Sequence, residues 1–205
     1  MGEGGTVQEE RRRQILQAAV HTFAAKGYHT CRVSDIATEA GVAYGLVYHY
    51  FGSKESLLEA IFEETWGAML GTISSVGQLD DPAAEQVRKV TEIVLRTWKR
   101  DPDLVRVLVR EVTRSAHLER ESDEIERAFE ALQRIVERGQ EAGEFRRDLD
   151  PRLVATIWYG ALEEVLTGWA LGQLPDAIDD VARAERAVVE MVAGGLASDR
   201  AAAPA

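Results

Sequence analysis

EAGVAYGLVYHYFGSKESLL, residues 39–58, holds three tyrosines, a histidine and a glycine between Tyr44 and Tyr50. On a helical wheel, one side of this segment carries Val47, Tyr50 and Phe51, which suit a protein core. The opposite side carries Tyr44, Gly45, Tyr48 and His49. A mid-helix glycine costs about 1 kcal/mol relative to alanine, and close approach of another molecule to the backbone would offset that cost. The segment therefore predicts a short helix with one face in the core and one face toward a partner.

The residues around this segment have the spacing of two helices joined by a tight turn. Ala37 is small enough for a close crossing of helix axes, Gly41 tolerates a left-handed backbone, and Val47 faces back from the second helix. This pattern predicts a helix-turn-helix over residues 33–40 and 43–51. The same spacing also fits an ordinary helical hairpin in a bundle, so spacing alone does not decide the function.

Helical periodicity extends along nearly the whole chain, and no convincing period-2 strand pattern occurs. Glycine and proline residues such as Gly27, Pro82 and Pro151 indicate where the helices end or begin. The predicted helices cover residues 8–26, 33–40, 43–51, 53–73, 82–100, 102–114, 118 or 122 to 142, 151–171 and 176–196. The predicted fold class is therefore all-α, with about nine helices. We expect an N-terminal three-helix head over residues 8–53 and a C-terminal helical domain over residues 54–197.

The chain of 205 residues has a formal net charge of -11, but this charge is unevenly spread. Residues 1–55 contain six basic and six acidic side chains, so residues 56–205 carry the whole excess. Acidity therefore argues against nucleic-acid binding only for the second segment. Cys31 is the only cysteine, and no apolar run reaches the roughly 20 residues that span a bilayer. These features indicate a cytoplasmic protein without a membrane partner.

The sequence does not support an enzymatic function. The four histidines make no metal-ligand spacing with one another, and no glycine-rich phosphate loop follows a strand. No cysteine–histidine nucleophile pair is indicated either. We therefore expect a protein that binds rather than catalyses, with neither a metal nor a cofactor.

Residues 27–63 closely resemble the N-terminal DNA-binding domain of the tetracycline-repressor (TetR) family. The matching features are Gly27-Tyr28, Asp35-Ile36-Ala37, Ala40-Gly41-Val42, Tyr48-His49-Tyr50-Phe51 and Ser53-Lys54-Glu55. The resemblance implies a repressor that acts as a homodimer on double-stranded, palindromic operator DNA. It also implies that the helix over residues 43–50 enters the major groove.

The resemblance further implies which residues contact DNA. The expected contacts are Arg32, Ser34, Ala43, Tyr44, Gly45, Leu46, Tyr48, His49 and Lys54. Tyr48 and His49 match positions that hold phosphate in the family. Lys54 begins the fourth helix, where its ammonium and the helix dipole both attract phosphate.

The chain departs from the family pattern at Ala43-Tyr44, where a hydroxyl and a cation are usual. Tyr44 then becomes a candidate base or sugar contact, and Leu46 a candidate contact for a thymine methyl group. Hydroxyl caps are missing as well, although Thr30 and Ser34 lie close enough in sequence to replace them. These departures leave the operator sequence open.

The last two predicted helices form the expected dimer interface. The helix over 151–171 is apolar on several sides, whereas a surface helix needs only one apolar stripe. We therefore expect it to contact both its own core and a partner. With the helix over 176–196 it would form a four-helix interface, as the family does.

Aromatic and apolar side chains mark the expected effector site. In the family, the helices that carry the four tryptophans enclose a cavity for a small apolar ligand. The expected lining is Trp66, Met69, Trp98, Phe129, Trp158, Tyr159 and Leu162. Ordinary core packing is the alternative for each of these residues.

Residues 105–119 and 160–172 also resemble the fatty-acid-degradation branch of the family, whose repressors release DNA on binding acyl-coenzyme A. Arg106, Arg110 and Arg114 recur every four residues, so one helix face could hold nucleotide phosphates. The alternative is a solvated face that pairs with nearby acidic residues. The expected effector is a long-chain fatty acyl-CoA that controls fatty acid metabolism genes. The alternative is a repressor of an efflux or multidrug-resistance operon that responds to diverse apolar molecules.

Overall fold

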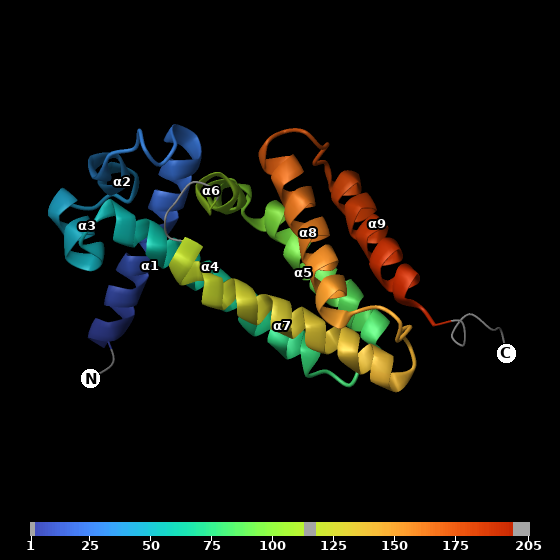
Figure 1. The fold of residues 1–205 in the computed structure, drawn as a ribbon. Coiled ribbons are helices and arrows are strands. Elements are labelled where there is room, and N and C mark those ends of the chain that lie inside the picture. The colour runs from blue at the N-terminus through green and yellow to red at the C-terminus, as the bar shows by residue number, and fades with distance from the viewer. Residues whose placement is uncertain (1–2, 113–117, 199–205) are drawn as a thin grey trace. The chain divides into compact units, whose positions relative to one another are not determined.

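The computed structural model describes residues 3–112 and 118–198, with side chains over 7–111 and 126–198. These residues form nine helices and no strand, which confirms the all-α prediction (Figure 1). The helices are α1 (Glu3–Lys26), α2 (Val33–Glu39), α3 (Tyr44–Phe51), α4 (Lys54–Gly77), α5 (Ala83–Arg100), α6 (Pro102–Val112), α7 (Leu118–Ala142), α8 (Pro151–Ala170) and α9 (Ile178–Leu196). No helix within these described ranges is both long and apolar enough to cross a membrane.

The chain divides into two compact units, which we call the head and the body. The head comprises the described residues of Met1–Trp66 and Asp103–Ser115, and the body those of Gly67–Pro102 and Ala116–Ala205. Helix α6 thus belongs largely to the head although it follows α5 in sequence. The structure also assigns the first part of α4 to the head and its remainder to the body.

The core of the head is built on one face of α1. Ile15, Ala19 and Phe23 are buried on this face, as their spacing predicts. Helix α1 ends where Gly27 adopts a φ of 78° and its N–H donates to the Phe23 carbonyl over 2.8 Å. The left-handed backbone at Gly27 favours glycine, which explains the predicted stop.

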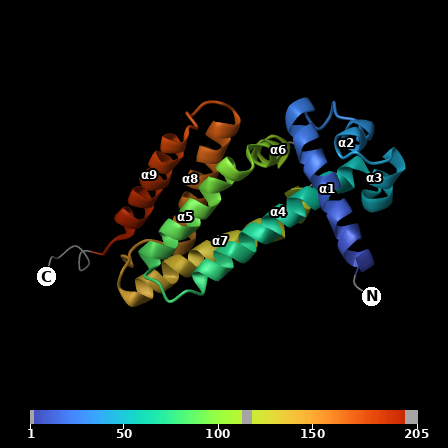
Figure 2. The same cartoon turned by 180° about the vertical axis from the view of Figure 1, so that it is seen from behind.

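The body is a bundle in which α5 packs against α7, α8 and α9, while α8 also packs against α7 and α9 (Figures 1 and 2). Helix α8 begins as predicted, because the Asp150 carboxylate accepts a hydrogen bond from the Leu153 N–H over 2.8 Å and Pro151 opens the first turn. Near its end, Leu174 fills the space beside Gly168, where a Cβ would lie 2.6 Å from the leucine side chain. This glycine therefore serves packing inside the body.

Two predicted boundaries are wrong by a turn or more. The first helix begins at Glu3 rather than at residue 8, and the helix predicted over residues 53–73 continues to Gly77. Polar side chains in this last turn of α4 bond back along the helix, as Ser75 Oγ does to the Gly71 carbonyl over 2.8 Å. Such back-bonding lets serine and threonine remain helical.

Candidate nucleic-acid interface and effector site

The turn between α2 and α3 has the geometry that its sequence predicts. Gly41 has a φ of 62°, and its N–H donates to the Thr38 carbonyl over 3.1 Å. The Val42 N–H donates to the Ala37 carbonyl over 3.0 Å. Ala37 and Val47 are both buried, so the two helices pack closely there. Gly41 is therefore required by the left-handed turn, which confirms the helix-turn-helix.

Helix α3 divides into the two predicted faces. Val47 and Phe51 are buried, and Tyr50 is half-buried. On the other side Tyr44 and Tyr48 are 52% and 41% exposed, which is high for large aromatic residues. Gly45 and His49 are exposed there too. The core holds α3 by one face and leaves a polar aromatic face uncovered.

The two tyrosines of this face order each other. Tyr44 Oη donates a hydrogen bond to Tyr48 Oη over 3.1 Å, and their rings lie edge to face with centroids 5.1 Å apart. The contact with Tyr44 raises the pKa of the Tyr48 phenol. Between them, a Cβ added at Gly45 would meet no atom within 4 Å. Nothing in the described chain requires glycine at this position.

The start of α2 is capped by Asp35, not by a hydroxyl side chain as expected. The Arg32 N–H donates to Asp35 Oδ2 over 2.9 Å, and Lys26 lies 2.8 Å from the same carboxylate. Lys26, followed by the Arg32 N–H, lowers the pKa of Asp35. Thr30 and Ser34 do not supply this cap, because an acidic residue in the third helical position does so. The side chains of Arg32 and Ser34 remain exposed.

Lys54 has a structural role that its sequence position did not reveal. Its Nζ donates to the carbonyls of Tyr28 and Cys31 over 2.9 and 3.1 Å, and it lies 4.4 Å from the centre of the Tyr28 ring. The half-buried ammonium therefore ties the start of α4 to the loop before α2. Of the remaining expected DNA contacts, Ala43 is exposed and has no side-chain cap, and Leu46 is half-buried.

Two further polar contacts link α1 to other segments of the head. Gln14 Nε2 donates to the Ala40 carbonyl over 2.7 Å, at the turn of the helix-turn-helix. Arg12 pairs with Glu64 and lies 5.4 Å from the centre of the Phe51 ring. No spacing signal along the sequence links these pairs, because the partners are distant in sequence.

Two of the expected effector-site tryptophans lie deep in the body. Trp158 is fully buried, and its Nε1 donates to Thr91 Oγ1 over 3.1 Å. Trp98 is buried against Trp169, with ring centroids 6.1 Å apart, and its Nε1 donates to Asp176 Oδ2 over 3.2 Å. Both side chains are therefore part of the packed core.

Other expected lining residues are less enclosed. Phe129 and Tyr159 are half-buried and contact each other, with ring centroids 4.7 Å apart. Arg152 lies over the Phe129 ring at 4.9 Å. Met69 is half-buried on α4 and Leu162 is buried on α8. The structure brings Phe129 and Tyr159 together.

The arginine stripe of α6 is engaged inside the head. Arg106 pairs with Asp103 at 2.8 Å, and Arg110 donates to the Ala24 carbonyl over 3.2 Å. Arg114 lies outside the described residues. A phosphate that bound to Arg106 or Arg110 would therefore compete with existing partners.

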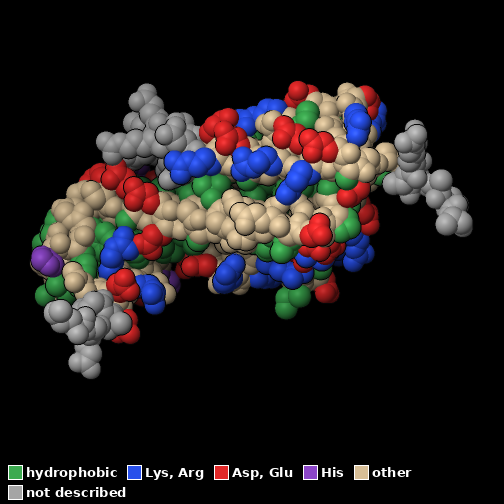
Figure 3. All heavy atoms as spheres, turned by 90° about the horizontal axis from the view of Figure 1, so that it is seen from below, with side chains coloured by type: hydrophobic (Ala, Val, Ile, Leu, Met, Phe, Trp, Pro, Cys, Tyr) green, Lys and Arg blue, Asp and Glu red, His purple; other side chains and the backbone are tan. Residues whose placement is uncertain are grey.

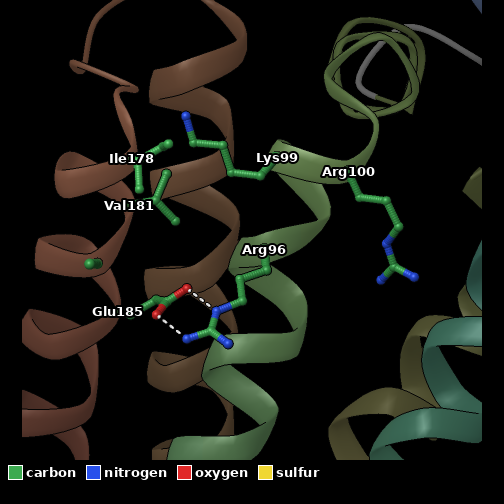
Figure 4. A pocket seen from close by; sticks show the side chains of 7 residues that line it. Arg96, Lys99, Arg100, Ile178, Val181 and Glu185 are labelled. Atoms are coloured by element: carbon green, nitrogen blue, oxygen red, sulfur yellow. Dashed lines mark hydrogen bonds and ion pairs between the residues drawn. The ribbon is translucent and has the colours of Figure 1, made fainter.

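A hollow of about 600 Å³ lies between α5 and α9 (Figure 4). Its lining is Arg96, Lys99, Arg100, Ile178, Val181, Ala182 and Glu185. The Arg96 guanidinium holds the buried Glu185 carboxylate with two hydrogen bonds of 2.8 and 3.1 Å, and Lys99 donates to the Asp176 carbonyl. None of the predicted effector residues lines this hollow, and its cations are largely engaged.

The surface seen in Figure 3 carries acidic and basic side chains interspersed, with hydrophobic side chains between them. Within the described residues, no cluster of three His, Cys, Asp or Glu side chains is arranged to hold a metal ion. What the described chain presents is thus a helix-turn-helix with one uncovered face, together with a helical body.

Comparisons with known proteins agree with this architecture. Residues 15–61 match the family model of bacterial regulatory proteins of the tetR family, and residues 84–167 match a tetracyclin repressor-like C-terminal domain. The chain belongs to the TetR family of transcriptional regulators. It is a TetR-type repressor rather than an enzyme, and regulators of this family bind operator DNA and act as dimers.

Within the family, the chain is similar to regulators of fatty acid metabolism. It is 30% identical to the fatty acid metabolism regulator protein of Bacillus subtilis over 185 residues, which are 89% of this chain and 94% of the relative. The crystal structure of FadR from B. subtilis in complex with stearoyl-CoA aligns with a TM-score of 0.77 and 28% identity, covering 90% of this chain and 98% of FadR. SmeT, the repressor of the Stenotrophomonas maltophilia multidrug efflux pump SmeDEF, shares the fold, with a TM-score of 0.75 and 22% identity over 92% and 91% of the two chains.

Proposed function

We propose that this repressor binds a palindromic operator as a homodimer in the cytoplasm and releases it when a long-chain acyl-CoA binds. The observation that carries the DNA-binding part is the uncovered face of α3, where an ordered tyrosine pair flanks a glycine that the fold does not need. Support for the effector comes from a fatty acid metabolism regulator that is 30% identical to this chain over 94% of the regulator's length. The genes that it controls are then genes of fatty acid metabolism.

The proposed DNA contacts are the residues that the family resemblance indicates, and all but Leu46 and Lys54 are exposed. They are Arg32, Ser34, Ala43, Tyr44, Gly45, Leu46, Tyr48, His49 and Lys54. Tyr44 lies at the start of α3, where recognition helices meet base edges, and Gly45 allows the DNA backbone to approach. Lys54 can reach a phosphate only by sharing its ammonium with the carbonyls of Tyr28 and Cys31. We therefore expect it to contribute less than Tyr48.

We propose that α8 and α9 form the homodimer interface. Leu153 and Ile157 on α8 are 59% and 61% exposed, and Met191 on α9 is 79% exposed. Gly160 and Gly194 are helical glycines with no atom within 4 Å of an added Cβ. Exposed apolar side chains beside small residues are typical of a surface that another helix pair covers.

For the effector, we propose contacts with Trp66 and Met69 on α4 and with Phe129, Tyr159 and Leu162 in the body. Trp98 and Trp158 support this site from the packed core, because their indoles are already bonded to Asp176 and Thr91. We propose functional domains over residues 8–53 for DNA binding and 54–197 for effector binding and dimerisation. The compact units divide the chain differently, because the first part of α4 and most of α6 belong to the head.

The test is a fluorescence anisotropy titration on DNA from the chain's own promoter region. Binding should be tight at low salt and should weaken steeply as salt rises, because phosphate contacts release counterions. Palmitoyl-CoA should then dissociate the complex, whereas unrelated apolar cations should not. Release by apolar cations and not by palmitoyl-CoA would favour the efflux alternative, and absence of salt-sensitive binding would contradict the DNA-binding proposal.

The arginine stripe is tested separately. If Arg106 and Arg110 hold phosphates of the coenzyme, the Arg106→Ala and Arg110→Ala variants should lose acyl-CoA affinity and keep operator affinity. If they only fasten α6 within the head, acyl-CoA affinity should be unchanged. The contacts to Asp103 and the Ala24 carbonyl support the second outcome.

A further inference from the structure

The four tryptophans of the chain differ in one respect. All are buried, with at most 9% of the side chain exposed. Trp98, Trp158 and Trp169 donate their indole N–H to Asp176 Oδ2, Thr91 Oγ1 and the Pro175 carbonyl, over 3.2, 3.1 and 3.0 Å. Trp66 Nε1 is the buried side-chain polar atom that has no hydrogen-bond partner among the described residues.

The polar groups nearest to Trp66 in sequence have other partners. Thr65 Oγ1 donates to the Ile61 carbonyl over 2.7 Å, and Glu64 pairs with Arg12. The next turn of α4 offers Met69, a half-buried apolar side chain. Because native proteins pair nearly all buried polar groups, an indole N–H without a partner among the described residues points to an acceptor on a bound molecule.

An indole N–H is a donor only, so its partner must be an acceptor. An acyl chain has no acceptor along its length, and burying a coenzyme phosphate beside Met69 would carry a large desolvation cost. The amide carbonyls of the pantetheine arm are neutral acceptors but lie further from the acyl chain, whereas the thioester carbonyl is neutral and directly attached to it. A ligand with this carbonyl offers a neutral acceptor to the Trp66 N–H and an adjoining apolar chain to the Met69 side chain.

We infer that Trp66 donates a hydrogen bond from Nε1 to the thioester carbonyl of the acyl-CoA effector and thereby selects acyl over alkyl chains. This assignment rests on the proposed acyl-CoA function. A buried donor that a ligand satisfies rejects a ligand without the acceptor, because the donor then stays unpaired in the complex. Trp66 is therefore a specificity residue rather than only part of an apolar wall.

The test compares palmitoyl-CoA with S-hexadecyl-CoA, a thioether with the same chain length and coenzyme but without the carbonyl. Isothermal titration calorimetry on the full-length protein would measure both ligands against wild type, Trp66→Phe and Trp169→Phe. Trp66→Phe removes the N–H and keeps an aromatic ring. Trp169→Phe is the matched control, because its indole already has a partner.

Wild type should bind the thioester about tenfold more tightly than the thioether, the factor expected for one buried hydrogen bond. Trp66→Phe should bind the two ligands equally, and Trp169→Phe should keep the wild-type ratio. An equal affinity of wild type for both ligands would overturn the assignment and leave the proposed function intact. If wild type bound neither ligand, the acyl-CoA function itself would fail, and the assignment with it.

A second measurement does not depend on a stable variant. Indole amide resonances in a ¹⁵N-tryptophan-labelled wild-type sample report the hydrogen bond of each Nε1 separately. One resonance should move downfield in the proton dimension when palmitoyl-CoA binds, and should stay in place with S-hexadecyl-CoA. Its absence from the Trp66→Phe spectrum would assign it. Equal shifts with both ligands would exclude a bond to the carbonyl.

Discussion

The head and the body differ in where their large aromatic side chains lie. On α3 of the head, Tyr44 and Tyr48 contact each other and remain 52% and 41% exposed. In the body, Trp98 and Trp158 are buried and their N–H groups are bonded to residues of other segments. A large aromatic residue left outside the core indicates a partner, whereas one inside the core with its polar atom satisfied is accounted for by stability. This difference predicts that substitutions in the two regions change different measurable quantities.

The largest effect is expected for Trp158→Ala in the body. Replacing a fully buried tryptophan by alanine removes its packing and leaves the Thr91 hydroxyl without its partner, which should cost about 3–5 kcal/mol of unfolding free energy. Urea unfolding at a fixed protomer concentration measures this cost, because dimers unfold in a concentration-dependent manner. A loss below 1 kcal/mol would show that Trp158 does not belong to the core.

In the head, the double variant Tyr44→Ala, Tyr48→Ala should lower operator affinity and leave stability nearly unchanged. Operator affinity should fall about 100-fold, since each base or phosphate contact contributes roughly 1–3 kcal/mol. The unfolding free energy should change by less than about 0.5 kcal/mol, because both residues are exposed. Fluorescence anisotropy and urea unfolding on the same preparation separate the two quantities. A stability loss without a loss of affinity would remove these tyrosines from the interface.

Two glycines test this comparison further, because replacement by alanine should raise the unfolding free energy at one and lower it at the other. At Gly45 an added Cβ meets nothing within 4 Å, so Gly45→Ala should stabilise the protein by about 1 kcal/mol and weaken operator binding about tenfold. At Gly139 it would lie 2.3 Å from Phe145 and 2.8 Å from Ala83, so Gly139→Ala should destabilise by about 1–3 kcal/mol.

Thermal or urea unfolding shows whether each glycine variant gains or loses unfolding free energy. Titration of the operator, with the protein concentration corrected for the folded fraction, gives the operator affinity. Gly139→Ala should leave operator affinity unchanged, so it serves as the control for Gly45→Ala. If Gly45→Ala bound the operator as wild type does, the DNA backbone would not approach α3 at this position.

The sequence allowed the two faces of α3 to be predicted because its contacts are local. Val47 and Phe51 recur on one side of a helix, and the left-handed φ of Gly41 follows from residue type at a turn. Long-range polar partners were not predictable in this way. The hydrogen bond from Trp98 to Asp176 joins residues 78 positions apart, and no periodicity along the chain indicates it.

The same dependence on tertiary contacts explains why the roles of some residues were only partly predicted. Lys54 was predicted as a phosphate contact from its place at the start of a helix, but its bonds to the Tyr28 and Cys31 carbonyls depend on tertiary packing. Arg106 is different, since its partner Asp103 lies three residues away and the spacing was readable. The missing partner of the Trp66 N–H among the described residues was not predictable either, because it depends on which groups the fold brings close to the indole.

The smallest predicted effect concerns Glu163 on α8 and depends on pH. Glu163 is exposed at its outer edge, but partial desolvation by its surroundings, and secondarily repulsion by Glu164, raise its pKa. A carboxyl with a raised folded-state pKa is protonated in both states below its unfolded pKa of about 4.3, so it costs nothing there. As pH rises through the folded-state pKa, the folded protein must hold an unfavourable charge and loses stability.

Glu163→Gln should therefore stabilise the protein at pH 7.5 and have little effect at pH 4 in urea unfolding. Glu164→Gln should give a smaller gain at pH 7.5, because it relieves only the repulsion. An equal effect of Glu163→Gln at both pH values would show that charge at this site is not the cause.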